Sequence, residues 1–455
     1  MKTVVAGATG FVGRSLVARL SGDGHEVVAC SRSGSAVPGG RSVAVDVGDE
    51  AGVAAVLADA DVAYYLVHSL DVGEFRDRDR RLAEAFGRAA ATAGVGRIVY
   101  LGGLGEDPSS EHLVSRQEVG TALGAAGVPV VELRAAVVLG SGSISFEMLR
   151  HLTERLPFMV CPRWVRTAIQ PIALGDVIEY LVRSVTVAPG VYEIGGPEVT
   201  TYREMIAAYA DARGLPRRLI LDVPYLTPRL SSYWVDLVTP VDSTVSHALI
   251  ESLVTEVVVL DAARTDAAFG LEPVGVVAAI RAALDAQAAE LDHGLMRLGS
   301  GLVDGVYAER VVVPADGVPE ADLDADLDRI GGDDDWYGLA PLWQLRRLLG
   351  RLMGEHWTLH RPSVVADGAD VDWWTVVDRT PGRLILRGRG WAPGEAWLGY
   401  AVDGDEVVQV GALRTKGVFG FLYWKMLVPV HLTVFRSLAR HRVVRARRAP
   451  QRTSV

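Results

Sequence analysis

Three glycines near the start of the chain have the spacing that phosphate binding requires. Gly7, Gly10 and Gly13 follow a short apolar run at residues 4–6, and apolar residues at helical spacing come directly after them. Glycines in this pattern let a strand turn tightly into a helix and let the backbone approach a pyrophosphate, whose charge meets the N–H groups of the helix N-terminus. The sequence therefore predicts a dinucleotide cradle; the alternative is a tight turn without a ligand. The residues expected to form the cradle are Gly7, Thr9, Gly10, Phe11, Val12 and Gly13.

The residues after the second predicted strand favour NADP(H). In NAD-binding proteins a carboxylate at the carboxyl end of this strand holds the ribose. Glu26 opens the strand instead, and the strand is followed by Ser31 and Arg32. A guanidinium can bind a 2′-phosphate with two hydrogen bonds, and Arg14 adds a second positive charge. We therefore expect NADP(H), with NAD(H) as the alternative; without a ligand, both arginines would be solvated surface residues.

Two further polar residues stand where predicted strands end. Asp46 follows the third strand, where it is placed to contact the adenine edge or to cap the next helix. His68 follows the fourth strand and is expected near the nicotinamide ribose, although a single histidine is more often structural. Both complete the expected cofactor site.

The elements that position these residues follow an alternating pattern. Apolar runs typical of strands alternate with amphipathic runs typical of helices, which predicts a doubly wound α/β sheet of parallel strands. Further helices are expected at 176–183 and 202–213, and a helix at 274–291 closes a cofactor domain of residues 1–300. The predicted strands are residues 3–6, 26–30, 42–45, 62–67, 97–101 and 130–133.

Length and composition limit the classes of protein that fit. A chain of 455 residues exceeds one ordinary core, so two domains are expected. The net charge of -10 argues against a nucleic-acid partner. Cys30 and Cys161 lack the spacing of metal ligands, which predicts a reducing compartment and no metal site. Because the first strand begins at once, no ordinary signal peptide is expected, and we expect a cytoplasmic location.

An acidic stretch at residues 316–335 separates two regions of different composition. Its charges and paired glycines predict a solvated linker, because few of its residues could pack in a core. Calcium binding is the alternative, but the stretch lacks the loop pattern of an EF-hand. Eight of the ten tryptophans lie beyond residue 330.

The second domain is expected at residues 336–448. An amphipathic helix at 342–353 precedes alternating segments at 372–377, 383–389, 396–402 and 406–413, and a long helix is expected at 429–445. Alternation predicts an antiparallel sheet with one buried face, hence an α+β domain. Its aromatic residues could line an apolar ligand cavity or simply fill the core: Trp373, Trp374, Trp391, Trp397, Tyr423 and Trp424.

The apolar run at residues 417–435 approaches the length of a membrane span. Lys425, Pro429 and His431 interrupt it, whereas a spanning helix needs about 20 mostly apolar residues. We therefore expect a buried strand–turn–helix. Arginines follow the run, and peripheral attachment to a membrane stays open as an alternative.

These motifs resemble the atypical short-chain dehydrogenases/reductases, in particular the NmrA-like NAD(P)-binding branch. The resemblance covers about residues 1–270 and rests on the segments GATGFVG, YYLVHSL, RIVYLGGLG, ELRAAVVLG and QPIALGDV. The segments GGPEVTTYREM, VPYLTPRLS and LVTPV are similar to a subgroup that carries a second domain of unknown function. In that domain the similarity is GVFGFLYWKMLVPVHLTVF, and the resemblance implies a START-like, helix-grip shape with a sheet curled around a long helix.

The resemblance also implies a catalytic pattern that this chain lacks. Such enzymes use a serine and a tyrosine-x-x-x-lysine pair, in which the lysine lowers the pKa of the tyrosine. Here His112 and Arg116 stand at the tyrosine and lysine positions, and the serine position falls on Gly102 or Gly103. The three lysines of the chain are Lys2, Lys416 and Lys425. Either His112 acts as the acid with Arg116 beside it, or the helix has lost its chemistry and both residues are solvated.

Two functions follow from this reasoning. The first is an NADP(H)-binding oxidoreductase that acts on an apolar carbonyl compound or enone, with substrate entering beside residues 215–253. The second is a non-catalytic NADP(H) sensor or ligand-binding regulatory protein. A membrane-associated lipid handler is a third, weaker alternative.

Overall fold

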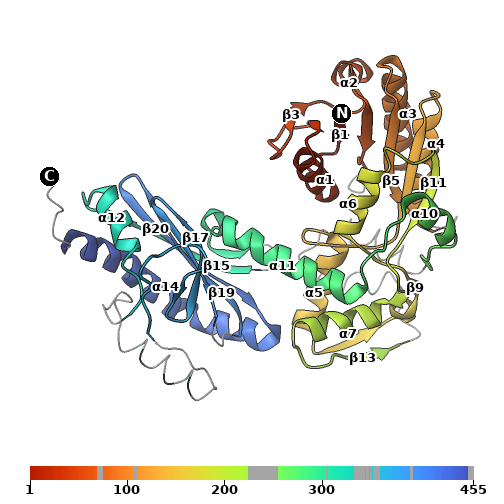
Figure 1. Ribbon diagram of the computed structural model, residues 1–455. Helices are drawn as coiled ribbons and strands as arrows, with labels where there is room; N and C mark the ends of the chain where they lie inside the picture. The colour runs from red at the N-terminus through yellow and green to blue at the C-terminus, as the bar shows by residue number, and fades with distance from the viewer. Residues whose placement is uncertain are drawn as a thin grey trace. The chain divides into compact units, whose positions relative to one another are not determined.

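The computed structural model describes residues 1–68, 75–105, 111–223, 255–303, 306–332, 359–389 and 393–448, together with positions 344, 348 and 351. The chain forms two compact units (Figure 1). The first comprises Met1–Thr153 and Pro157–Leu284, and the second comprises Glu154–Leu156 and Asp285–Val455.

The first unit contains a seven-stranded parallel sheet. Its strand order is β11-β6-β5-β4-β1-β2-β3, and each neighbouring pair is parallel. This confirms the predicted doubly wound α/β fold. The strands are β1 Lys2–Ala6, β2 Glu26–Ser31, β3 Arg41–Ala44, β4 Val62–Tyr65, β5 Arg97–Gly103, β6 Val130–Ala135 and β11 Gly190–Ile194.

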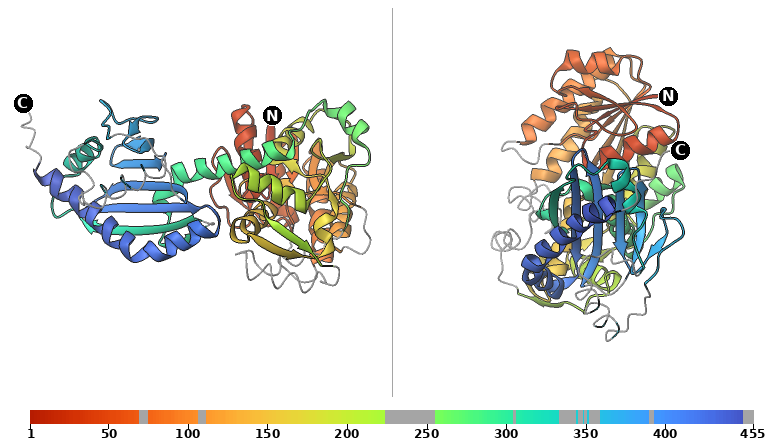
Figure 2. Two further views of the ribbon diagram at one scale, coloured as in Figure 1. Left: turned by 90° about the horizontal axis from the view of Figure 1, so that it is seen from below. Right: turned by 90° about the vertical axis from the view of Figure 1, so that its left-hand side faces the viewer.

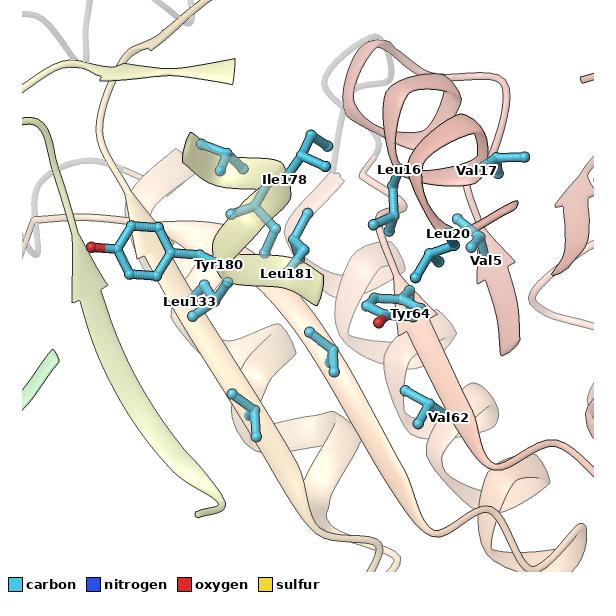
Figure 3. Close-up of a cluster of buried hydrophobic side chains, with 14 of the residues drawn as sticks. Val5, Leu16, Val17, Leu20, Val62, Tyr64, Leu133, Ile178, Tyr180 and Leu181 are labelled. Atoms are coloured by element: carbon cyan, nitrogen blue, oxygen red, sulfur yellow. The ribbon is translucent and has the colours of Figure 1, made fainter. Parts of the chain in front are cut away.

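Helices cover both faces of this sheet. Helices α1 (Phe11–Gly22) and α6 (Leu174–Arg183) pack on one face, where Leu16, Leu20 and Leu181 meet Tyr64 and neighbouring strand residues (Figure 3). The other face is covered by α2 (Glu50–Leu57), α3 (Phe75–Thr92) and α4 (Glu111–Gly124). Because both faces are covered, the central strands are apolar throughout rather than alternating.

The rest of the first unit follows β6. The predicted helices at 176–183 and 202–213 are confirmed as α6 and α7, and α7 begins with a capping box between Thr201 and Glu204. The other elements are β7 Val138–Leu139, α5 Ile144–Arg155, β8 Phe158–Cys161, η1 Arg163–Arg166, β9 Ala168–Ile169, β10 Ile172–Ala173, β12 Thr200–Thr201, α7 Tyr202–Ala212, β13 Leu219–Asp222 and α10 Ala262–Phe269.

The second unit contains a seven-stranded antiparallel sheet (Figure 2). Its order is β14-β15-β20-β19-β18-β17-β16. The predicted antiparallel sheet followed by a long carboxyl-terminal helix is confirmed. The elements from residue 276 onward, of which α11 begins within the first unit, are α11 Val276–Gly294, η2 Leu295–Arg297, β14 Gly301–Val303, β15 Val306–Pro314, α12 Glu320–Leu327, β16 Asp370–Val371, β17 Trp374–Thr380, β18 Arg383–Gly388, β19 Gly394–Asp403, β20 Glu406–Thr415 and α14 Gly417–Arg448.

Helices lie against each face of the second sheet as well. On one face Val408, Val410 and Trp397 pack against Leu295 and the end of α11. On the other face, clusters from β15, β18, β19 and β20 pack against α12 and α14. The described tryptophans 373, 374 and 397 are buried in these clusters, and Trp424 is buried in a further one with Tyr307 and Leu413. Trp391 and the expected helix at 342–353 lie outside the described residues, apart from the three single positions noted above.

Three expectations for the second unit need correction. The acidic stretch holds α12, whose Leu323 and Leu327 are buried, instead of forming a solvated linker throughout. Strands β14 and β15 precede it within the second compact unit, where no strand was expected. Residues 417–435 form the first part of the continuous helix α14, which contains Pro429, instead of a strand–turn–helix. In the part of the chain that the structure describes, no helix is both long enough and apolar enough to cross a membrane.

Candidate functional site

The glycine-rich turn joins β1 to α1 with its backbone closely packed. Gly7 has a φ of +84°, and its N–H donates to the carbonyl of Cys30 at 3.1 Å. A Cβ on Gly7 would lie 2.7 Å from the carbonyl oxygen of Leu66, and a Cβ on Gly13 would lie 2.3 Å from the carbonyl oxygen of Gly7. Helix α1 begins after Gly10 without a side-chain cap, so its N-terminal N–H groups are not satisfied by such a cap. The turn has the glycine positions and the helix N-terminus that a pyrophosphate requires.

A cavity of about 480 Å³ lies at this turn and extends over the carboxyl ends of β4, β5 and β6. It brings together seven of the predicted site residues: Gly7, Gly10, Phe11, Val12, Gly13, His68 and Arg116. Thr9, Arg14, Ser31, Arg32 and Asp46 do not line it. Most of these residues are those expected at the pyrophosphate and nicotinamide end of the cofactor.

The residues expected at the adenosine end come from three places: Ser31 and Arg32 at the end of β2, Asp46 after β3, and Arg14 at the start of α1. Ser31 has a buried Oγ with no hydrogen-bond partner among the described residues, which fits a polar group of a bound nucleotide. Arg32 and Arg14 are exposed. Asp46 is exposed too, and its carboxylate accepts a hydrogen bond from the N–H of Gly48 at 2.8 Å. Helix α2 is capped by Asp49, which accepts from Gly52, so Asp46 is not its cap.

Helix α4 packs directly on the end of β5, at the place of the expected catalytic group. A Cβ on Gly103 would lie 3.6 Å from the side chain of Arg116. The hydroxyl of Tyr100 donates to the backbone carbonyl of Arg116 at 2.9 Å, and the Arg116 Nε is buried without a hydrogen-bond partner among the described residues. Burial raises the pKa of Tyr100 to about 12, against the opposing effect of the Arg116 guanidinium. His112 belongs to α4, but its side chain lies outside the described residues.

Sequence reasoning missed most of the cavity wall. The wall is predominantly apolar, and Ser143, Ser145 and Tyr202 are among its polar residues. Its further members are Leu66, Leu101, Leu104, Leu113, Ala135, Ala136, Val137, Val138, Ile144, Ile169 and Val257. Residues 136–145 directly follow a parallel strand, and ligands of open α/β sheets bind beyond such strand ends. The position of residues 136–145 after a strand could therefore have predicted that they line the cavity. Of the segment 215–253, residues 224–253 lie outside the described residues.

The possible metal ligands and the two cysteines do not form a further site among the described residues. Among the described residues, no three of His, Cys, Asp and Glu gather as metal ligands. Cys30 and Cys161 are both free and buried, and burial raises the pKa of each thiol to about 11. A thiol with a raised pKa is a poor nucleophile at neutral pH.

Two family models match separate parts of the chain. Residues 7–127 match an NAD(P)H-binding family, and residues 303–438 match a family of proteins of unknown function, DUF2867. The first match contains the glycine turn, and the second contains most of the antiparallel sheet and the first two-thirds of α14.

Curated relatives are similar to about half of the chain. A dTDP-6-deoxy-L-talose 4-dehydrogenase (NAD(P)(+)) of Kitasatospora kifunensis is 27% identical over an alignment of 265 residues, and the match covers 49% of this chain and 82% of that protein. Mitochondrial NADH dehydrogenase [ubiquinone] 1 alpha subcomplex subunit 9 of Arabidopsis thaliana is 26% identical over an alignment of 241 residues, and the match covers 48% of this chain and 60% of that protein. The two names describe different functions, so the similarity does not assign a reaction to this chain.

Solved structures share the fold. UDP-glucose 4-epimerase of Thermotoga maritima superposes with a TM-score of 0.51 at 14% identity, covering 64% of this chain and all of that one. MoeE5, solved with UDP-glucose and NAD, superposes with a TM-score of 0.50 at 18% identity over 64% of this chain and all of its own. Together with the glycine turn and its cavity, these findings show that the first unit has a Rossmann fold whose residues 7–127 match an NAD(P)H-binding family.

Proposed function

We propose that the protein binds NADP(H) and reduces an apolar carbonyl compound or enone. One observation carries this proposal: the cavity at the glycine turn has a mostly apolar wall and one arginine, Arg116 of α4, which lies beside the end of β5. Apolar side chains favour an apolar substrate, and a few polar groups fix its orientation. NADP(H) is favoured because Arg32 is exposed directly after β2, where a 2′-phosphate would need a positive partner, and Arg14 is exposed at the start of α1.

The residues of α4 supply the polar chemistry. When bound, NADPH supplies a hydride to the electrophilic carbon of the substrate. The guanidinium of Arg116 would donate hydrogen bonds to the substrate oxygen and stabilise the negative charge that develops there. A proton must then reach this oxygen. His112, one helical turn before Arg116, is the proposed donor, because imidazole titrates near neutral pH.

A non-catalytic NADP(H) sensor is the second candidate. It is favoured by Gly102 and Gly103, which leave the serine position without a hydroxyl, and by the absence of a lysine between Lys2 and Lys416. In this function the cofactor would bind without turnover. The same cavity would then hold nucleotide and a regulatory ligand.

Turnover distinguishes these two functions. NADPH oxidation should be followed with a panel of apolar aldehydes, ketones and enones, and NADPH affinity should be measured separately by fluorescence titration. For an enzyme, His112→Ala and Arg116→Ala abolish or strongly reduce oxidation, whereas Arg88→Ala, a change of an exposed arginine on α3, leaves it unchanged. Tight NADPH binding with no oxidation across the panel would favour the sensor. Absence of NADPH binding would contradict both.

For the second unit we propose an apolar ligand with a polar end. Tyr400 and Gln409 are paired across β19 and β20, and both are buried. The hydroxyl of Tyr400, both polar side-chain atoms of Gln409 and the Nε1 of Trp374 have no hydrogen-bond partner among the described residues. Leaving such groups unpaired costs about 1–3 kcal/mol each, which a polar ligand group or ordered water would offset.

Native mass spectrometry of the intact protein tests this second proposal. We expect a co-purified small molecule, and we expect Gln409→Leu to lose it while NADPH affinity stays unchanged. A protein that carries no such mass, and whose stability rises in Gln409→Leu, would contradict the proposal. That result would instead show an unpaired amide that the fold tolerates.

A further inference from the structure

One face of α14 combines exposed apolar residues with exposed arginines. Phe419, Leu422, Met426 and Val430 recur at helical spacing, and their exposed fractions are 62%, 49%, 75% and 46%. Large apolar side chains that gather on one face mark an interaction surface, whereas single ones do not. We call these four residues the apolar stripe. The opposite side of α14 faces the sheet of the second unit (Figure 2).

The same outward side becomes cationic toward the end of the helix. Arg436, Arg440, Arg447 and Arg448 are all exposed, and Arg436 and Arg440 continue the spacing of the apolar stripe. Helix α14 contains one lysine, six arginines and no acidic residue, although the whole chain has a net charge of -10. Arg442 and Arg445 are turned inward to Asp326. The outward charge is therefore concentrated on one part of an otherwise acidic protein.

This pairing of features points to one kind of partner. We infer that the outward face of α14 binds the surface of a membrane that contains anionic lipids. The apolar stripe enters the boundary between headgroups and acyl chains, and the arginines contact lipid phosphates. The helix lies on the membrane and does not cross it. This inference goes beyond the proposed reaction and does not depend on it.

Two other partners fit this face less well. In a second copy of the chain docked face to face about a two-fold axis, α14 would meet α14, which has no acidic residue to pair with the arginines. A nucleic acid would meet the arginines but would leave the apolar stripe exposed to water. An anionic membrane offers acyl chains to the apolar stripe and phosphates to the arginines.

Vesicle flotation of the full chain tests the inference. Vesicles of phosphatidylcholine alone are compared with vesicles of equal parts phosphatidylcholine and phosphatidylglycerol. We expect binding to the anionic vesicles that weakens with added salt, and weak or no binding to the neutral vesicles. Arg436→Gln/Arg440→Gln should reduce partition by roughly 25-fold, fivefold for each arginine.

The apolar stripe is tested by Leu422→Glu/Met426→Glu, which should abolish flotation. Leu260→Glu is the matched control, because Leu260 is 78% exposed in the first unit. NADPH affinity and the thermal midpoint of each variant show that it is folded, and they separate this test from that of the proposed reaction. Equal flotation of all variants, or none with anionic vesicles, would overturn the inference. A dimer that the glutamate variant dissociates, without vesicle binding, would identify a second copy as the partner, and binding to duplex DNA would identify nucleic acid.

Discussion

The backbone of Gly13 lies directly against the carbonyl of Gly7, so that a Cβ on Gly13 would be 2.3 Å from the Gly7 oxygen. This contact holds the first turn of α1 close to the end of β1. It places the N-terminus of the helix at the cavity, which Gly7, Gly10 and Gly13 all line. A glycine at position 13 is therefore needed for packing as well as for ligand approach.

Replacing Gly13 by alanine should displace the start of α1. We expect a loss of NADPH affinity of about tenfold or more, together with a loss of about 1–3 kcal/mol in the free energy of unfolding, because the methyl group overpacks the turn. Fluorescence titration and urea unfolding measure the two effects. Gly22→Ala is the control: the same helix ends there, and an added Cβ meets no atom within 4 Å. Equal effects of both substitutions would contradict this role of the contact.

Arg32 should set the preference for NADPH over NADH. It is exposed and follows β2 directly, beside the buried, unpaired hydroxyl of Ser31. Because a guanidinium–phosphate hydrogen bond is worth about 1.5–3 kcal/mol, Arg32→Ala should lower the ratio of NADPH to NADH affinity by about tenfold or more. Arg14→Ala should lower it less. Titration of each variant with both nucleotides measures the ratio. If Arg32→Ala leaves it unchanged, the 2′-phosphate assignment is wrong.

The parts of the fold that sequence predicts are those fixed by neighbouring residues. The turn from β1 to α1 is an example, since its glycines, its strand and its helix are adjacent. Strand β15 was missed because Val311, Val312 and Val313 form a continuous apolar run. In the sheet these residues alternate: Val311 and Val313 are buried, and Val312 is 45% exposed. Pairing with β20, far along the chain, gives them this arrangement.

The residues of the candidate site also divide into those that local sequence predicts and those whose positions depend on distant contacts. Gly7 and Arg116 could be found from local motifs. Val257 could not, because its position in the cavity wall depends on a bridge to Ile169, across a long stretch of sequence. The burial of Asp326 likewise depends on an arginine 116 residues away. A charge in an acidic run predicts a solvated segment unless this distant partner is known.

The ion pair between Arg442 and Asp326 should be costly to break from one side. Their side chains are 2% and 1% exposed, with 2.9 Å between the Arg442 Nη1 and the Asp326 Oδ2. Asp326→Leu should destabilise the second unit by about 3–5 kcal/mol, because it removes the carboxylate that pairs with both Arg442 and Arg445. Arg442→Met should cost less, because Asp326 keeps its ion pair with Arg445. The double variant should be more stable than the sum of the two losses implies.

Urea unfolding of the four proteins gives the coupling free energy between Arg442 and Asp326. Arg447→Met is the control, because Arg447 is exposed and donates to the backbone carbonyl of Asp316. Additive effects of the two single substitutions would show that the charges are not coupled in the folded protein.

His431 should make the stability of the second unit depend on pH. The centroid of its ring lies 4.7 Å from that of Trp424 and 5.6 Å from that of Phe435. Its Nδ1 is buried and has no hydrogen-bond partner among the described residues. Burial lowers the pKa of His431 from 6.5 to about 4. Between these two values the unfolded chain binds a proton and the folded chain does not. The stabilisation is therefore complete above about pH 6.5 and is lost as the pH falls toward 4.

Because His431 is only partly enclosed, we expect a loss of about 1–2 kcal/mol between pH 7 and pH 4.5 rather than the full value of the shift. Urea unfolding of the wild type and of His431→Phe at a series of pH values measures it: the difference between the two free energies of unfolding should change with the predicted sign. His293→Gln, a change of an exposed histidine, is the control for loss of an imidazole. A wild type and a His431→Phe variant whose free energies stay parallel from pH 7 to pH 4.5 would show that His431 is protonated equally in the folded and unfolded chains.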